Sequence, residues 1–138
     1  MRFMLLLKAS QDTEAGALQG EALTSEMERY NEALVRAGVL LDAAGLHPSS
    51  RGARIDFSQG KRTVTNGPFT ETNELIAGFW MIQVKSREEA LEWARRCPHP
   101  EGSADSRIEL RQVFEPSDFP TESQEPTELE LRAARSRS

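Results

Sequence analysis

Two stretches of almost unbroken apolar residues dominate the pattern of the chain. Residues 2–8 (RFMLLLK) and residues 77–84 (AGFWMIQV) lack the strict alternation of apolar and polar positions that marks a strand with one wet face. Both are also far shorter than the ~20 apolar residues that a membrane-spanning helix needs. They therefore predict two central strands of one sheet, each buried on both faces.

Two amphipathic helices are predicted, one between these strands and one after the second. In the first helix, apolar residues recur at steps of four, three and four, with charged residues between them. Gly38 suits the left-handed conformation that often ends a helix. The apolar positions of this helix are Leu23, Met27, Tyr30 and Leu34.

The second helix carries its own start and stop signals. Ser86 and Glu89 have the spacing of a capping box, in which each side chain accepts a hydrogen bond from the backbone of the other residue. Pro98 then ends the helix, because proline lacks the N–H that a further turn requires. The apolar stripe of this helix consists of Ala90, Trp93, Ala94 and Cys97.

The remaining strands are shorter or more polar. Residues 39–46 and residues 108–114 supply two further strands of the sheet. Between them, residues 53–57 and 62–65 are predicted to pair as a hairpin across the loop 58–61, which contains a glycine. Side chains alternate in this hairpin, so we expect one of its faces to be wet.

The resulting order, β-α-β-β-α-β with an added hairpin, is that of a ferredoxin-like α+β domain. Helices on one face leave the other face of the sheet open. Because both central strands are apolar on both sides, we expect the open face to pack on a second copy, giving a homodimer. The domain is predicted to span residues 1–119, followed by a mobile polar tail over residues 120–138.

Composition, charge and motif content argue against several functional classes of protein. The formal net charge of -5 disfavours nucleic acid as a partner, because that interaction needs clustered Lys and Arg. The first apolar run is too short for a secretion signal, and a lone Cys97 cannot form an intramolecular disulfide, so we expect a cytoplasmic protein without a membrane segment. His47 and His99 lack zinc-ligand spacing, and no phosphate-binding loop or nucleophile elbow is present, so neither a metal nor a cofactor is predicted.

Asp42 and His47, on and after the second strand, are the candidates for proton transfer. An imidazole titrates near neutral pH and can bind a ligand or move a proton, although an exposed or backbone-bonded histidine is the plainer interpretation of His47. Strand alternation places Asp42 on the face opposite His47 unless a bulge near Gly45 intervenes. The two residues therefore need not form a pair.

Polar residues at other element ends are candidates for ligand binding. Lys8 ends the first strand and can present a cation to an anion, with a solvated lysine as the alternative. Asn66 opens an Asn-Gly-Pro turn, which changes the direction of the chain. Glu71 and Glu74 come after this turn. Their spacing is compatible with a helix cap, with a pair of ligand-facing carboxylates or with a wet loop.

The segment GKRTVTNGPFTETNELIAGFWMIQVKSREEALEWARRCP resembles the DGPF-motif branch of the YCII-related family. The likeness continues through LLDAAGLHPSS upstream and IELRQVFEPSDF downstream, so it covers residues 1–119. The resemblance implies a ferredoxin-like fold that pairs into a dimeric α+β barrel, with a pocket between sheet and partner. It also implies a regulatory association, because such relatives are often encoded beside extracytoplasmic-function sigma factors.

The chain departs from the family pattern at two places. Asn66 stands where the motif has an aspartate, and the predicted first helix lacks the histidine that some YCII relatives pair with an aspartate in a proposed active site. Asp42 is the candidate match for that aspartate, whereas His47 does not replace the missing histidine. A histidine–aspartate mechanism is therefore not carried over as a whole.

Three hypotheses follow. The first is a cytoplasmic homodimer that binds a small polar or anionic ligand in a cleft, with Asp42 and His47 as catalytic candidates if a reaction takes place. The second is a non-catalytic regulatory partner of a sigma factor, and the third is a lyase or isomerase that uses Asp42 or His47 as its base. The cleft of the first hypothesis is lined by Lys8, Asp42, His47, Asn66 and Glu71.

Overall fold

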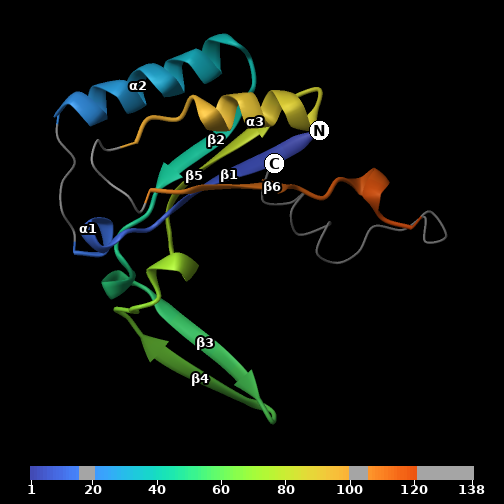
Figure 1. The fold of residues 1–138 in the computed structure, drawn as a ribbon. Coiled ribbons are helices and arrows are strands. Elements are labelled where there is room, and N and C mark those ends of the chain that lie inside the picture. Colours follow the sequence, from blue (N-terminus) through green and yellow to red (C-terminus); the bar gives the residue numbers. More distant parts are fainter. Residues whose placement is uncertain (16–20, 100–105, 121–138) are drawn as a thin grey trace.

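A single sheet with helices on one face forms the body of the protein, and a hairpin projects from it (Figure 1). The computed structural model describes residues 1–15, 21–99 and 106–120, so the predicted tail over residues 120–138 lies almost wholly outside the described residues. Within the described part of the chain, no helix is long and apolar enough to cross a membrane.

The sheet has four strands in the order β2-β5-β1-β6, and each neighbouring pair is antiparallel. The two predicted apolar runs form its two central strands, which confirms their placement. This architecture is compatible with a ferredoxin-like α+β fold. The strands are β1 (Arg2–Lys8), β2 (Leu40–Gly45), β5 (Ile76–Gln83) and β6 (Ile108–Gln112).

Two longer helices cover one face of the sheet, α2 (Glu21–Arg36) and α3 (Arg87–Arg95), and a short α1 (Gln11–Glu14) follows β1. Their apolar stripes pack on Phe3, Leu5 and Ile82, all nearly or wholly inaccessible to solvent. The periodicity of the sequence thus identified the core correctly. It contains Tyr30, Leu34, Trp80, Ala90, Trp93 and Cys97 as well.

The helix boundaries follow the predicted signals with one correction. Gly38 adopts φ +71°, the left-handed conformation expected after α2. The Ser86 hydroxyl oxygen accepts a hydrogen bond from the Glu89 backbone N–H at 3.1 Å. The Glu89 carboxylate, however, accepts from the N–H of Lys85 at 3.0 Å and not from that of Ser86, so the predicted reciprocal capping box is only half correct.

Strands β3 (Ala53–Ser58) and β4 (Lys61–Asn66) form the projecting hairpin. Pairing extends to Ser58 and Lys61, so the turn consists of only two residues, Gln59 (φ +50°) and Gly60 (φ +76°). The expectation of one wet face is wrong for a single chain, because both faces are largely exposed. One face even carries large apolar side chains, those of Ile55, Phe57 and Val64.

The other face of the main sheet is uncovered in the single chain. Side chains alternate along β1, so Met4 and Leu6 lie opposite the buried face and are only half-buried. Their cross-strand partners on β5, Met81 and Phe79, are also half-buried. Burial on both faces of the central strands is therefore not reached within one chain.

Three single turns of 3-10 helix complete the described structure. The first follows β2, the second precedes β5 and the third follows β6. Their bounds are η1 (Ser49–Arg51), η2 (Thr72–Glu74) and η3 (Pro116–Asp118).

Candidate functional site

A polar pocket of about 230 Å³ lies where β1 ends. Four segments meet there: the end of β1, the first residue of α1, the 3-10 turn η2 and the residues that lead into β6. Seven of the described residues line the pocket, namely Lys8, Ala9, Gln11, Thr72, Asn73, Ser106 and Arg107. Of the five residues predicted to form a site, only Lys8 is among them.

Sheet register brings two cations together in this pocket. Leu7 pairs with Ile108, and the next backbone hydrogen bond runs from the Lys8 N–H to the Arg107 carbonyl at 2.9 Å. Lys8 and Arg107 are therefore neighbours on adjacent antiparallel strands. Lys8 is half-buried and Arg107 is exposed.

Backbone hydrogen bonds and a helix cap fix the other sides of the pocket. The Ala9 N–H donates to the Leu75 carbonyl at 3.0 Å, which ties the end of β1 to the residue after η2. Ser10 then caps α1, because its hydroxyl oxygen accepts from the Thr13 N–H at 3.2 Å and its own N–H donates to the Thr13 hydroxyl at 2.8 Å. Gln11 is thereby held at the first position of α1.

Neither cation of the pocket has a carboxylate partner among the described residues. Other arginines in the described ranges do form ion pairs, such as Arg2 with Glu115 at 3.6 Å. Within those ranges Lys8 and Arg107 form none. Like charges on neighbouring strands repel each other. A small anion bound between them would relieve this repulsion.

Asp42 and His47 are not joined by any described hydrogen bond or pocket. Asp42 is exposed on β2, lies opposite Met81, and accepts a hydrogen bond from the Ala43 N–H at 2.8 Å. A register irregularity does occur in β2, but it lies between Leu40 and Asp42 and not near Gly45. His47 follows the strand and is exposed.

Glu71 belongs to an ionic cluster at the base of the hairpin. The guanidinium of Arg54 lies 3.5 Å from the Glu71 carboxylate and 3.8 Å from that of Glu74. The same guanidinium lies 3.8 Å above the centre of the Phe69 ring. Asn66 ends β4, exposed and opposite Ala53, so no described contact brings Asn66 or Glu71 to Lys8.

The Asn-Gly-Pro-Phe turn closes onto the segment after β2. The Gly67 N–H donates to the Gly52 carbonyl at 2.9 Å, and a Cβ atom on Gly67 would lie only 1.8 Å from the Ser49 carbonyl oxygen. The Phe69 N–H donates to the Ser49 hydroxyl oxygen at 2.9 Å. The Ser49 backbone N–H and hydroxyl both donate to the Glu14 carboxylate. These contacts give the motif a structural role, which we call the turn clasp.

Sequence reasoning missed five polar side chains of the pocket, those of Gln11, Thr72, Asn73, Ser106 and Arg107. Gln11, Thr72 and Asn73 carry no pattern that separates them from ordinary loop residues. The sequence does offer one indication of Arg107, because this residue directly precedes a predicted strand. An antiparallel neighbour of β1 has to begin where β1 ends, so the register itself would have indicated this residue.

Comparison with known proteins agrees with the α+β architecture and then identifies the family. The model of the YCII-related domain matches residues 1–115. A protein of Rhizobium meliloti (strain 1021), described as uncharacterised, is 30% identical over 104 residues, which cover 75% of this chain and 84% of that protein. The chain belongs to the YCII-related family. Its place in the DGPF-motif branch stays a prediction.

Proposed function

We propose that this YCII-related protein binds a small anionic ligand in the pocket at the end of β1. The observation that carries the proposal is the pair of neighbouring cations, Lys8 and Arg107, that lacks a carboxylate partner among the described residues. Side chains of Gln11, Thr72 and Asn73 add uncharged hydrogen-bonding groups around them. Such a set suits a carboxylate or a phosphate group.

The proposal is one of binding and not of turnover. Among the seven described residues that line the pocket, none carries a carboxylate, an imidazole or a thiol, and the proposal assigns both cations to binding the anion. A volume of about 230 Å³ suits a compact anion more than a nucleotide. Asp42 and His47 remain candidates for proton transfer outside this pocket.

Thermal unfolding in the presence of inorganic phosphate or succinate tests the proposal. A ligand at ~100 times its Kd stabilises the folded state by about 2.7 kcal/mol, which raises Tm measurably. We expect a saturable rise that disappears in Lys8→Met and in Arg107→Met. Sodium chloride at matched ionic strength controls for general salt effects, and Lys61→Met, at the start of β4, controls for loss of one charge.

Two outcomes would overturn the proposal. An equal rise in Tm for the native protein, Lys8→Met and Arg107→Met would mean that the anions act on the surface as a whole. A rise that sodium chloride reproduces would have the same meaning.

We further propose that the open face of the sheet pairs with a second copy of the chain. One cross-strand row on this face runs through Asp42, Met81, Met4 and Arg111, with an acid at one edge and a base at the other. A two-fold axis parallel to the strands would lay the β2 edge of one copy over the β6 edge of the other. Asp42 would then face Arg111 of the partner subunit, with apolar side chains between the two pairs.

Light scattering after size exclusion tests the pairing. We expect a mass twice that of the 15.4 kDa chain. Leu6→Glu, at a half-buried position of the open face, should return the mass to that of one chain. Val35→Glu is the matched control, because Val35 is an exposed apolar residue on α2. A native protein that has the mass of one chain would refute the pairing.

A further inference from the structure

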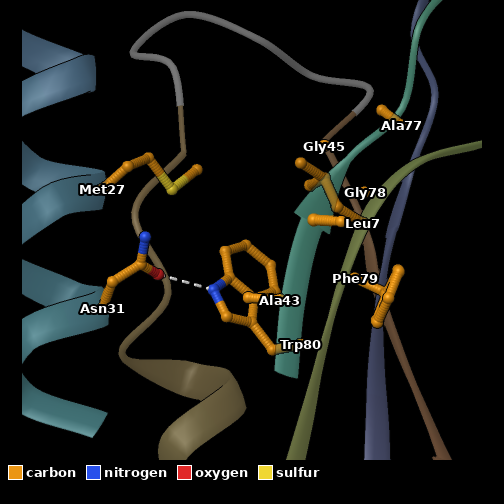
Figure 2. Close-up of a pocket in the computed structure, with 10 residues that line it drawn as sticks. Leu7, Met27, Asn31, Ala43, Gly45, Ala77, Gly78, Phe79 and Trp80 are labelled. Carbon is orange, nitrogen blue, oxygen red and sulfur yellow. Dashed lines mark hydrogen bonds between the residues drawn. The ribbon is translucent and has the colours of Figure 1, made fainter. Parts of the chain in front are cut away.

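A second cavity, separate from the pocket of the two cations, lies between α2 and the β2 edge of the sheet. It has a volume of about 330 Å³ (Figure 2). Sheet register explains why this space stays open. On the face that α2 covers, Gly45 pairs with Gly78 and Ala43 pairs with Trp80, so three of these four positions carry little or no side chain. The helix therefore has nothing to pack on at this point.

The backbone conformation at Gly45 does not require a glycine. Its φ lies outside the left-handed region, and a Cβ atom built on it would meet nothing within 4 Å. Gly67 contrasts with it, because a Cβ there would collide with the Ser49 carbonyl. At Gly45 the missing side chain leaves usable volume, and a larger residue would fill it.

One polar side chain is held in a fixed orientation at the wall of this cavity. The Trp80 indole N–H donates to the Asn31 Oδ1 at 2.7 Å, which orients the amide. Figure 2 shows the Asn31 nitrogen turned away from Trp80, on the side of Met27. No described residue accepts from this nitrogen, so its two N–H groups are available to a ligand.

The remaining lining selects against charge. None of the ten described residues around the cavity is ionisable at neutral pH, and a charged group placed there would lose hydration without gaining a counterion from them. The Trp80 ring and the Met27 thioether offer flat and polarisable surfaces. The volume lies at the lower end of the ~300–1,000 Å³ typical of small-molecule sites.

We propose that this cavity binds a small neutral compound with one ring, whose carbonyl oxygen accepts a hydrogen bond from the Asn31 amide. The ring lies between Trp80 and Met27 and covers the space above Gly45. This site is independent of the anion pocket, since the two share no lining residue.

Three probes of similar shape separate the parts of the proposal. Acetophenone has a ring and a neutral carbonyl, ethylbenzene lacks the acceptor, and benzoate carries a charge. The readout is the indole N–H signal of Trp80 in ¹⁵N-labelled protein. We expect a saturable shift with acetophenone and an affinity at least about fivefold weaker for ethylbenzene, which corresponds to the loss of one hydrogen bond. Benzoate should bind more weakly than either.

Variants of two residues test the geometry. Asn31→Asp keeps an oxygen for Trp80 but replaces the free donor by an acceptor, so it should abolish the preference for acetophenone over ethylbenzene. Gly45→Val fills the cavity and should weaken acetophenone at least about tenfold, while Tm stays equal or rises because apolar surface is buried. Gly45→Ala should have a smaller effect in the same direction.

The matched control is Gly52→Ala, which adds the same methyl group at an extended glycine outside the cavity, where a Cβ makes only an ordinary 3.5 Å contact. It should bind acetophenone like the native protein. The proposal is overturned if acetophenone gives no saturable shift, if benzoate binds as tightly as acetophenone, or if folded Gly45→Val retains the native affinity. An unchanged preference in Asn31→Asp would overturn the role of the amide.

Discussion

A Cβ atom on Gly67 would lie 1.8 Å from the backbone carbonyl oxygen of Ser49, closer than any two such atoms can approach. The turn clasp thus requires glycine at this position through contact between two backbones and not through an unusual φ. This contact accounts for the glycine of the Asn-Gly-Pro-Phe motif.

Gly67→Ala is therefore expected to destabilise the fold by about 2 kcal/mol or more, because the turn has to move off Ser49. Urea unfolding measures the loss. Gly52→Ala serves as its control, since the added methyl makes an ordinary contact and should change the free energy of unfolding by less than about 1 kcal/mol. Equal effects of the two substitutions would contradict the close approach.

Ser49 joins two parts of the turn clasp. Its hydroxyl accepts from the Phe69 N–H and donates to Glu14, so Ser49→Ala should lose both interactions and cost about 1–3 kcal/mol in chemical denaturation. Ser50→Ala offers a neighbouring control, because Ser50 is exposed. A variant Ser49→Ala that is as stable as Ser50→Ala would show that the Ser49 hydroxyl contributes nothing to stability.

The Tyr30 hydroxyl donates to the Trp93 carbonyl at 2.6 Å and links α2 to α3. Tyr30→Phe should cost about 1 kcal/mol, since the carbonyl keeps a second donor in the Arg96 N–H at 3.1 Å. Tyr30→Leu should cost more, because it also removes edge-to-face contacts with Trp80 and Trp93. Thermal unfolding of both variants separates the hydroxyl from the ring.

Stability should fall in alkaline solution. Burial raises the pKa of the Cys97 thiol from 9.0 to about 12. Burial also raises the pKa of Tyr30. Both groups then hold their protons more tightly when folded, so their contribution is complete below the unfolded pKa and is lost as pH rises towards the folded one.

Urea unfolding between pH 8 and pH 11 provides the measurement. This range is set by the raised pKa of the Cys97 thiol. We expect the free energy of unfolding to decline above about pH 9, the ordinary pKa of the thiol. Cys97→Ala should reduce the slope, although the variant itself is less stable. A slope that is unchanged in Cys97→Ala would exclude the thiol as a cause.

The fold could be predicted because apolar periodicity is a local property. Residues 2–8 and 77–84 were predicted to be strands with apolar side chains on both faces, and they form the central strands of the sheet. Ile82 and Leu34, taken from a strand and from a helix stripe, are both wholly buried. Turn chemistry served equally well at Gly38, where φ is positive as expected.

The candidate site could not be predicted to the same degree, because it depends on which distant segments become neighbours. Lys8 was identified from its place at a strand end, but its companion Arg107 becomes visible only through the register of β6 on β1. Glu71 was weighed as a cap, a ligand or a wet loop, while its ion pair with Arg54 depends on how the hairpin returns. Sequence spacing contains neither relationship.

The hairpin of β3 and β4 is attached to the body of the protein at one end, beside the turn clasp, and its far end projects away from the main sheet (Figure 1). Its length can therefore change without disturbing the sheet. Insertion or deletion of two residues in each strand would keep Ile55, Phe57 and Val64 on their common face, whereas a change of one residue in each would turn the new tip over. The hairpin is thus the part of this domain best able to vary in length over evolution, in steps of two residues per strand.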